Sequence, residues 1–123
     1  MNFGNYFRAL RVAKGRTQAQ IAKIIGKSKM LVSGIETNKN GPFNEMDLKK
    51  ISKALDLTEM EKKKLSFEAA KARNKLPSHI SKYVMRNEVA VEVLDVMVQN
   101  NFNNNALKKV IKYMEILTSA KNN

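Results

Sequence analysis

The most informative segment of the sequence is TQAQIAKIIGKS, which spans residues 17–28. Its first threonine is followed three residues later by a glutamine, the spacing at which both side chains can satisfy free amides at a helix start. Apolar Ile21 and Ile25 lie at helical spacing, and Gly26 ends the helix after about two turns. Ser28 supplies a hydroxyl that can cap the next helix. The segment predicts two short helices joined by a glycine turn.

The rest of the chain shows the same helical spacing of apolar residues, with Gly and Pro between the periodic stretches. We therefore expect an all-α fold with two domains. The first, residues 1–76, should hold five helices: 2–14, 18–25, one after Ser28 that ends between Ile35 and Thr37, one after Asn44, and one after Thr58 that lasts to about Asn74. The second, residues 77–123, is a small helical extension.

Residues 88–99 fit two patterns. Valines alternate at 89, 91 and 93 as in a strand, whereas Glu92, Asp95 and Gln99 share one stripe at helical steps. We predict a helix, capped by Asn87. Residues 79–84 form a short helix or a turn, residues 100–105 an asparagine-rich connector, and a last helix follows from Leu107. Because residues 88–99 are apolar on nearly every side, either the same chain or a second subunit must cover them.

The charge of the chain favours polyanionic partners. Its formal net charge is +12, and residues 1–43 carry eight basic side chains against Glu36 alone. Such a surface attracts nucleic acid first, with acidic membranes and acidic proteins as alternatives. The lysines at positions 49, 50, 53 and 62–64 could equally be a solvated surface.

Several classes of protein are unlikely from composition and motifs. The chain has no cysteine, which excludes disulfides and cysteine-based zinc sites and fits the cytoplasm. It shows no secretory signal and no long apolar run, so we expect no membrane span. The GKS at 26–28 lacks the first glycine of a phosphate-binding loop, and His79 is the only histidine. We expect no enzyme activity, cofactor or metal.

Two short helices joined by a turn form the unit that lays its second helix in the major groove of double-stranded DNA. The first half of that helix contacts base edges, which makes Lys29, Met30 and Ser33 the candidates there, with Gly34 beside them. Lys29 can donate to guanine O6 and N7, whereas Met30 can contact a thymine methyl group.

Residues 17–28, together with VS at 32–33, IE at 35–36 and Pro42, resemble the Xre/Cro-like helix-turn-helix family of phage-repressor type. The resemblance covers about residues 3–57 and implies a lambda-repressor-like domain that binds DNA. It also implies a buried ion pair between Arg11 and Glu36, although two unrelated surface charges are an alternative, and a phosphate contact for Gln18. Arg16 and Lys27 stand where the family has apolar residues, and Gly34 where it has a long polar side chain.

The residues expected to contact DNA lie at the start of the first of the two helices, in the turn, on the second helix and in the loop after it: Thr17, Gln18, Lys27, Ser28, Lys29, Met30, Ser33, Asn38, Lys39 and Asn40. Residues 69–77 and 83–88 resemble the C-terminal extension of some small phage and mobile-element regulators. These features predict a transcriptional regulator, a repressor that binds an inverted-repeat operator as a homodimer through its C-terminal helices. The alternative is a helix-turn-helix module that engages a protein, as an antirepressor, an antitoxin or a phage anti-defence factor, which Met30 and Gly34 favour.

Overall fold

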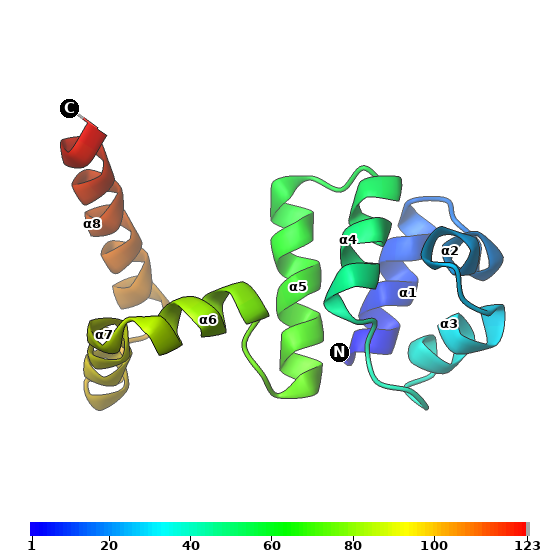
Figure 1. Cartoon of the computed structure of the whole chain (residues 1–123), viewed down its shortest axis with the longest axis horizontal. Coiled ribbons are helices and arrows are strands. Elements are labelled where there is room, and N and C mark those ends of the chain that lie inside the picture. Colours follow the sequence, from blue (N-terminus) through cyan, green and yellow to red (C-terminus); the bar gives the residue numbers. More distant parts are fainter. Residues whose placement is uncertain (123) are drawn as a thin grey trace. The chain divides into compact units, whose positions relative to one another are not determined.

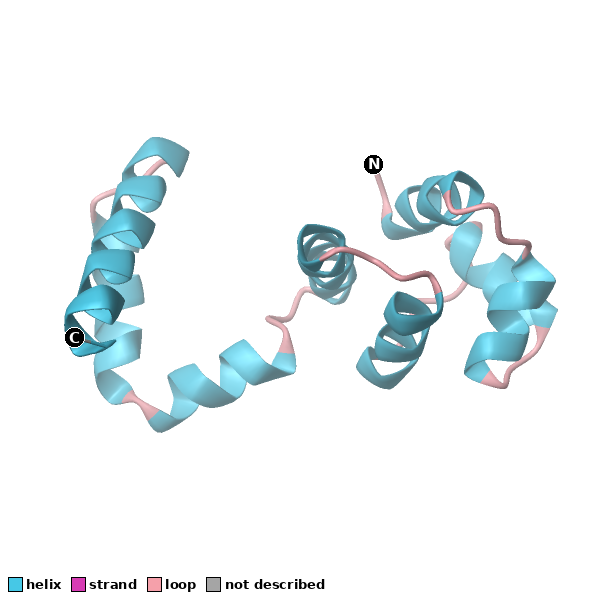
Figure 2. Cartoon of the chain, turned by 90° about the horizontal axis from the view of Figure 1, so that it is seen from above, coloured by secondary structure: helices cyan, strands magenta, loops and turns pink. Residues whose placement is uncertain are grey.

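The computed structural model describes residues 1–122, and the side chains of residues 1–120. Every regular element in this part of the chain is a helix, which confirms the all-α fold class (Figures 1 and 2). None of these helices is both long and apolar enough to cross a membrane. The eight helices of the described residues are α1 (Phe3–Ala13), α2 (Gln18–Ile25), α3 (Lys29–Glu36), α4 (Glu45–Ala54), α5 (Glu59–Arg73), α6 (Ser78–Arg86), α7 (Glu88–Gln99) and α8 (Asn104–Asn122).

The chain divides into two compact units, Met1–Ile80 and the residues from Ser81 onward. The first unit holds α1 to α5 and the first residues of α6, and the second holds the rest of α6 with α7 and α8. The sequence predicted a division four residues earlier, after residue 76. The predicted extension ends at Asn123, which lies outside the described residues.

The core of the first unit is built around three phenylalanines. The ring centroids of Phe7 and Phe43 lie 4.7 Å apart at an interplanar angle of 66°, and Phe3 stacks on Phe7 at 6.1 Å. Edge-to-face and stacked rings at such distances are favourable arrangements for aromatic pairs. Ile21 of α2 and Val32 of α3 are fully buried in the same cluster, so it holds the two helices of the central motif.

Side chains and left-handed residues set the helix ends largely as predicted. Thr17 with Gln20 at α2, and Thr58 with Glu61 at α5, form the two expected capping boxes. Ser28 and Asn44 cap α3 and α4 through their side-chain oxygens. Gly26 ends α2 at φ 68°, a left-handed conformation that glycine adopts without steric cost.

The second unit departs from the sequence prediction at two helix starts. Asn87 precedes α7, but its side chain does not cap that helix; instead its Nδ2 donates to the Tyr83 carbonyl at the end of α6. The predicted cap at Asn87 was therefore wrong, because the end of α6 binds the Asn87 side-chain amide instead. The connector is also shorter than predicted, since α8 begins at Asn104, where Asn103 Oδ1 accepts from the Ala106 amide at 2.9 Å.

Candidate nucleic-acid interface

The two sides of α3 differ in burial. Val32 and Ile35 are buried against the core, and Ser28 Oγ accepts a hydrogen bond from the Leu31 amide at 3.1 Å, which closes the start of the helix. Lys29 and Met30 lie on the opposite side, and Met30 is 84% exposed. The first turn of α3 is therefore available to another molecule.

A buried ion pair joins α1 to the end of α3. Arg11 Nε donates to Glu36 Oε2 at 2.7 Å and Arg11 Nη2 donates to Glu36 Oε1 at 3.0 Å. The same arginine donates through Nη1 to the Arg16 carbonyl at 2.7 Å. Gln18 Nε2, at the start of α2, donates to Glu36 Oε1 at 3.1 Å. One carboxylate thus fixes α1, α2 and α3 together, and Gln18 already has a partner within the protein.

The start of α1 lies close to the backbone at the end of α3 and to the turn that follows it. Asn38 adopts a left-handed conformation, with φ 62°, and its Oδ1 accepts a hydrogen bond from the Gly4 amide at 3.1 Å. A Cβ atom on Gly4 would lie 2.5 Å from the carbonyl oxygens of Ile35 and Glu36. Gly4 therefore permits a backbone approach that no other residue allows, and Asn38 has a structural role.

The glycine inside α3 has a local explanation. The amides of Lys39 and Asn40 both donate to the Gly34 carbonyl, at 2.9 and 3.0 Å, which folds the loop back over the end of the helix. A Cβ atom on Gly34 would overlap the side-chain amide of Asn40. Gly34 thus makes room for Asn40 on the outer side of α3, a relationship that the sequence did not predict.

The turn between α2 and α3 is tied to α4. Lys27 Nζ lies 2.5 Å from Oδ2 of Asp47, whose side chain is only 6% exposed. Arg16, the other basic residue at a position where the family has apolar ones, donates through Nη2 to the Ala54 carbonyl at 3.3 Å. Both departures from the family pattern therefore supply polar links from the connections before and after α2 to α4.

The residues expected at DNA fall into two groups. Those with partners inside the protein are Thr17 and Ser28, which cap helices, and Gln18, Lys27 and Asn38. Those that face outward without an ion pair among the described residues are Lys29 and Lys39. Met30 and Asn40 are exposed, and Ser33 is half-buried. The sequence did not point to Gly4 or Asp47, which position this surface.

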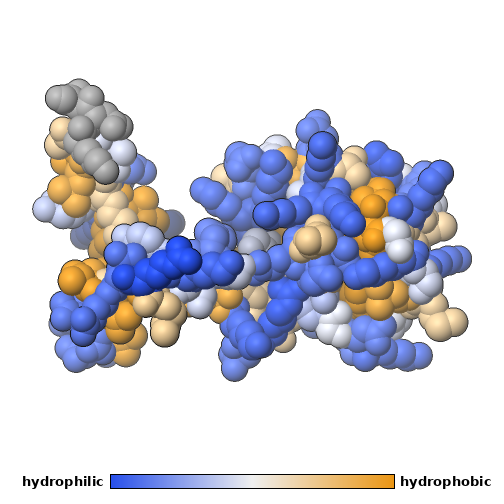
Figure 3. Space-filling view, in the orientation of Figure 1, coloured by the Kyte–Doolittle hydropathy of each residue, from blue (hydrophilic) through white to orange (hydrophobic). Residues whose placement is uncertain are grey.

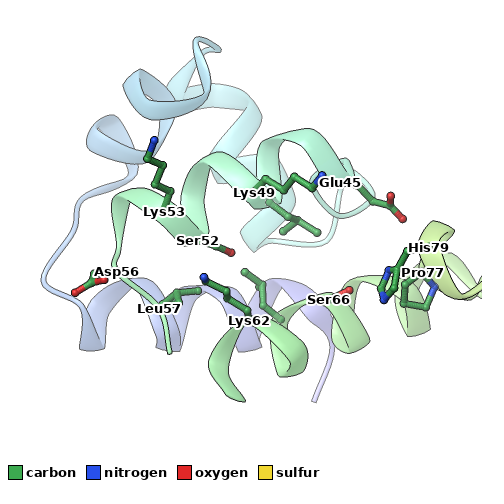
Figure 4. A pocket seen from close by; sticks show the side chains of 12 residues that line it. Glu45, Lys49, Ser52, Lys53, Asp56, Leu57, Lys62, Ser66, Pro77 and His79 are labelled. Atoms are coloured by element: carbon green, nitrogen blue, oxygen red, sulfur yellow. The ribbon is translucent and has the colours of Figure 1, made fainter. Parts of the chain in front are cut away.

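A separate groove of about 520 Å³ lies between α4, α5 and the start of α6 (Figure 4). Leu48, Leu57 and Leu65 line it together with lysines, and no residue of α3 contributes. At one end, Glu45 accepts hydrogen bonds from the hydroxyl and amide of Ser78, and these bonds lower the pKa of the Glu45 carboxyl. The groove is therefore distinct from the surface around α3.

The comparisons with known proteins agree with this arrangement. Residues 7–62 match the family model described as helix-turn-helix, and the match includes α2, α3 and the loop that follows. No curated protein and no solved structure matched the chain. The all-helical fold of this segment and its match to the helix-turn-helix model support the class of DNA-binding helix-turn-helix regulators. The matched segment resembles the Xre/Cro-like helix-turn-helix family of transcription regulators, whose members bind double-stranded DNA.

Proposed function

We propose that this protein is a cytoplasmic, homodimeric repressor of phage or mobile-element type that binds an inverted-repeat operator and thereby blocks a promoter. The observation that carries the proposal is the outer side of the first turn of α3. There Lys29 has no ion-pair partner among the described residues, and Met30 is 84% exposed. The inner side of the same helix is held in the core.

The side chains of this surface would have two roles. Lys29, Met30 and Ser33 would contact base edges, since the N-terminal half of a recognition helix reaches furthest into the major groove. Lys39 and Asn40 would contact phosphates, which position the protein without reading sequence. These five residues need no rearrangement to reach DNA.

The other expected contacts would require a change of partner. Gln18 would have to leave Glu36 to contact a phosphate, and Lys27 would have to leave Asp47 in the same way. Because each exchange breaks a hydrogen bond that already exists, we assign these two residues a smaller share of the binding energy. Thr17, Ser28 and Asn38 would contribute through the backbone that they hold in place.

A dimer would suit an inverted repeat. Two recognition helices related by a twofold axis and about 34 Å apart would enter successive major grooves on one side of the duplex. The exposed apolar residues of α7 and α8 support dimerisation through the C-terminal helices, since large apolar surfaces of soluble proteins are usually covered by a partner.

Selection of bound fragments from a random pool of duplex DNA tests the proposal, followed by titration of the selected and a scrambled duplex at increasing salt. We expect a twofold-symmetric consensus and a linear fall of log affinity with log salt for both duplexes, because phosphate contacts release counterions. The selected duplex should keep an advantage at every salt concentration. Equal affinity for both duplexes would contradict sequence-specific repression.

A second candidate function is that of a protein-binding module, an antirepressor, antitoxin or anti-defence factor for which DNA is secondary. It is favoured by the exposure of Met30 and by Gly34, which removes a side chain from the outer side of α3. If the purified chain ignores duplex DNA at low salt, this candidate replaces the first.

A further inference from the structure

The second unit has no interior of its own. No side chain from Lys71 to Ala120 is buried, whereas eleven large apolar side chains on α7 and α8 are between 42% and 72% exposed. Figure 3 shows hydrophobic colouring gathered on this part of the chain, in contrast to the mostly hydrophilic face of the first unit. The eleven residues are Val89, Val91, Val93, Leu94, Val96, Val98, Ile111, Tyr113, Met114, Ile116 and Leu117. This exceeds the scattered apolar residues of an ordinary monomer surface.

α7 is also a weak helix when considered alone. Five of its twelve residues are valine, a β-branched residue that lowers helix propensity, and no side chain caps its start. Helices of this length in water depend on packing of an apolar face for most of their stability. A unit of about forty residues without disulfides usually needs a partner as well. α7 therefore needs a covering surface.

The charge of α7 indicates what kind of surface covers it. α7 carries Glu88, Glu92 and Asp95 but no lysine or arginine, whereas each of the other seven helices of the described residues carries at least one. Phosphates would repel this helix, which excludes DNA as its partner. A basic protein surface with an apolar stripe is its complement.

α8 has that character. Lys108 and Lys112 are one helical turn apart, and at 100° per residue they lie beside Ile111 and Ile116. On α7 the same rule places Glu92 and Asp95 beside Val89 and Val96. Each helix thus has an apolar stripe edged by charge, negative on α7 and mostly positive on α8, as in helical pairs whose flanking charges select the partner.

These charges are not paired within the chain. Among the described residues no ion pair includes a charge of α7 or α8. The half-buried side chains closest in sequence to the turn at residues 100–103 are apolar: Met97, Phe102, Ala106, Leu107 and Val110. The acidic edge of α7 and the basic edge of α8 are therefore both available to a second copy of the chain.

From this pattern we infer that two copies pair crosswise, with α7 of each chain against α8 of the other. A twofold axis creates this contact twice, since the same surface is used by both subunits. Pairing of α7 with α7, or of α8 with α8, would instead place like charges together, which is unfavourable. The inference rests on the homodimer of the proposed function and specifies which helices meet.

Opposite charge reversals test the pairing. We would prepare Glu92→Lys/Asp95→Lys and, separately, Lys108→Glu/Lys112→Glu, and measure self-association by analytical ultracentrifugation. Each variant alone places like charges at both contacts, so we expect its dissociation constant to rise about tenfold or more. An equimolar mixture restores attraction at both contacts, and we expect heterodimers about as stable as the wild-type dimer. Lys49→Glu/Lys50→Glu, with the same charge change on α4, is the control and should associate as the wild type does.

Each outcome separates the pairing from the dimer itself. Variants that dimerise as the wild type does would overturn crosswise pairing but leave the dimer intact. If each variant self-associates weakly and mixing the two does not restore dimers, the attraction between α7 and α8 acts within one chain. This result would also overturn crosswise pairing. A monomeric wild type would remove both the pairing and the dimeric operator complex, whereas binding of DNA by α3 would be measured independently on the same sample.

Cross-linking gives a second measurement that needs no change of charge. Because the chain has no cysteine, Val96→Cys and Ile111→Cys introduce single thiols on exposed positions of α7 and α8. When the two variants are mixed with a short bismaleimide, we expect mixed dimers between the two thiols to exceed those between identical thiols. A preference for Val96→Cys joined to itself would overturn the inference.

Discussion

Arg11 and Glu36 meet through two hydrogen bonds, of 2.7 and 3.0 Å, although 25 residues separate them in the sequence. Both are buried, and the pair fixes the end of α3 to α1. Loss of one partner leaves the other charge buried without compensation, which typically costs about 3–5 kcal/mol. We expect Arg11→Met or Glu36→Leu to lower the free energy of unfolding by this amount in urea titrations.

The matched control for this pair is Lys62→Ala, which removes an exposed ion pair with Glu59. Exposed pairs contribute at most about 1 kcal/mol. The double variant Arg11→Met/Glu36→Leu should recover much of the stability, because it leaves neither charge unpaired. If the single variants were no less stable than the control, the structural importance assigned to the pair would be wrong.

Gly4 should tolerate no side chain. In Gly4→Ala the new Cβ would lie 2.5 Å from two backbone carbonyl oxygens at the end of α3, so either helix must move. Overpacking of this kind costs about 1–3 kcal/mol. Gly41→Ala is the control, since a Cβ there meets no atom within 4 Å. Thermal unfolding of the two variants should separate them clearly; equal melting temperatures would refute the close approach.

Gly34→Ala tests the contact with Asn40. Alanine is favoured over glycine in a helix by up to about 1 kcal/mol, but here the new methyl group displaces the Asn40 amide. We expect Gly34→Ala alone to gain little stability, and the same substitution in an Asn40→Ala background to gain close to the full amount. A double-mutant cycle measured by urea unfolding provides the coupling. The same gain in both backgrounds would show that the contact is absent.

Acid should destabilise the first unit through Glu68. The hydrogen bond from Lys64 is the main cause of the lowered pKa of this carboxyl, and Lys71 adds a second. A carboxyl whose pKa is lower in the folded state stabilises the protein above the ordinary value of 4.5, and that contribution disappears as pH falls through the folded-state pKa. Urea unfolding of the wild type and Glu68→Gln should therefore differ most near neutral pH and converge in acid. A constant difference would contradict this assignment.

Two lysines should affect DNA binding differently. Lys29→Ala removes a candidate base contact, so we expect it to reduce the preference for the selected duplex over a scrambled one, by about 1–3 kcal/mol of discrimination. Lys39→Ala removes a candidate phosphate contact, so it should weaken binding to both duplexes alike and reduce the salt slope by about one. Fluorescence anisotropy at several salt concentrations measures both. Equal and small effects of the two substitutions would count against this geometry.

Local rules account for what the sequence predicted well. The threonine and glutamine of residues 17–20, the left-handed Gly26 and the cap at Ser28 depend on residues within one helical turn, and the structure confirms all three. The valine-rich segment was ambiguous between helix and strand, but the spacing of Glu92 and Asp95 correctly indicated the helix α7.

The features that the sequence did not predict depend on contacts between residues of different elements. The sequence offers no local signal that Lys27 pairs with Asp47 or that Asn40 covers Gly34, because each partner is supplied by another element. The cap predicted at Asn87 was wrong for the same reason, since the end of α6 takes that side chain. Polar residues of the candidate interface thus had two possible partners, protein or DNA, and the sequence alone could not distinguish them.

The way α3 is held has a consequence for how such a protein could change its target. Buried Val32, Ile35 and Glu36 hold this helix, whereas Lys29 and Met30 lie in the first turn and contribute nothing to the core. Substitutions at these two positions would therefore leave stability nearly unchanged. A lineage of such regulators could acquire a new recognition sequence in a few steps, without first having to become more stable.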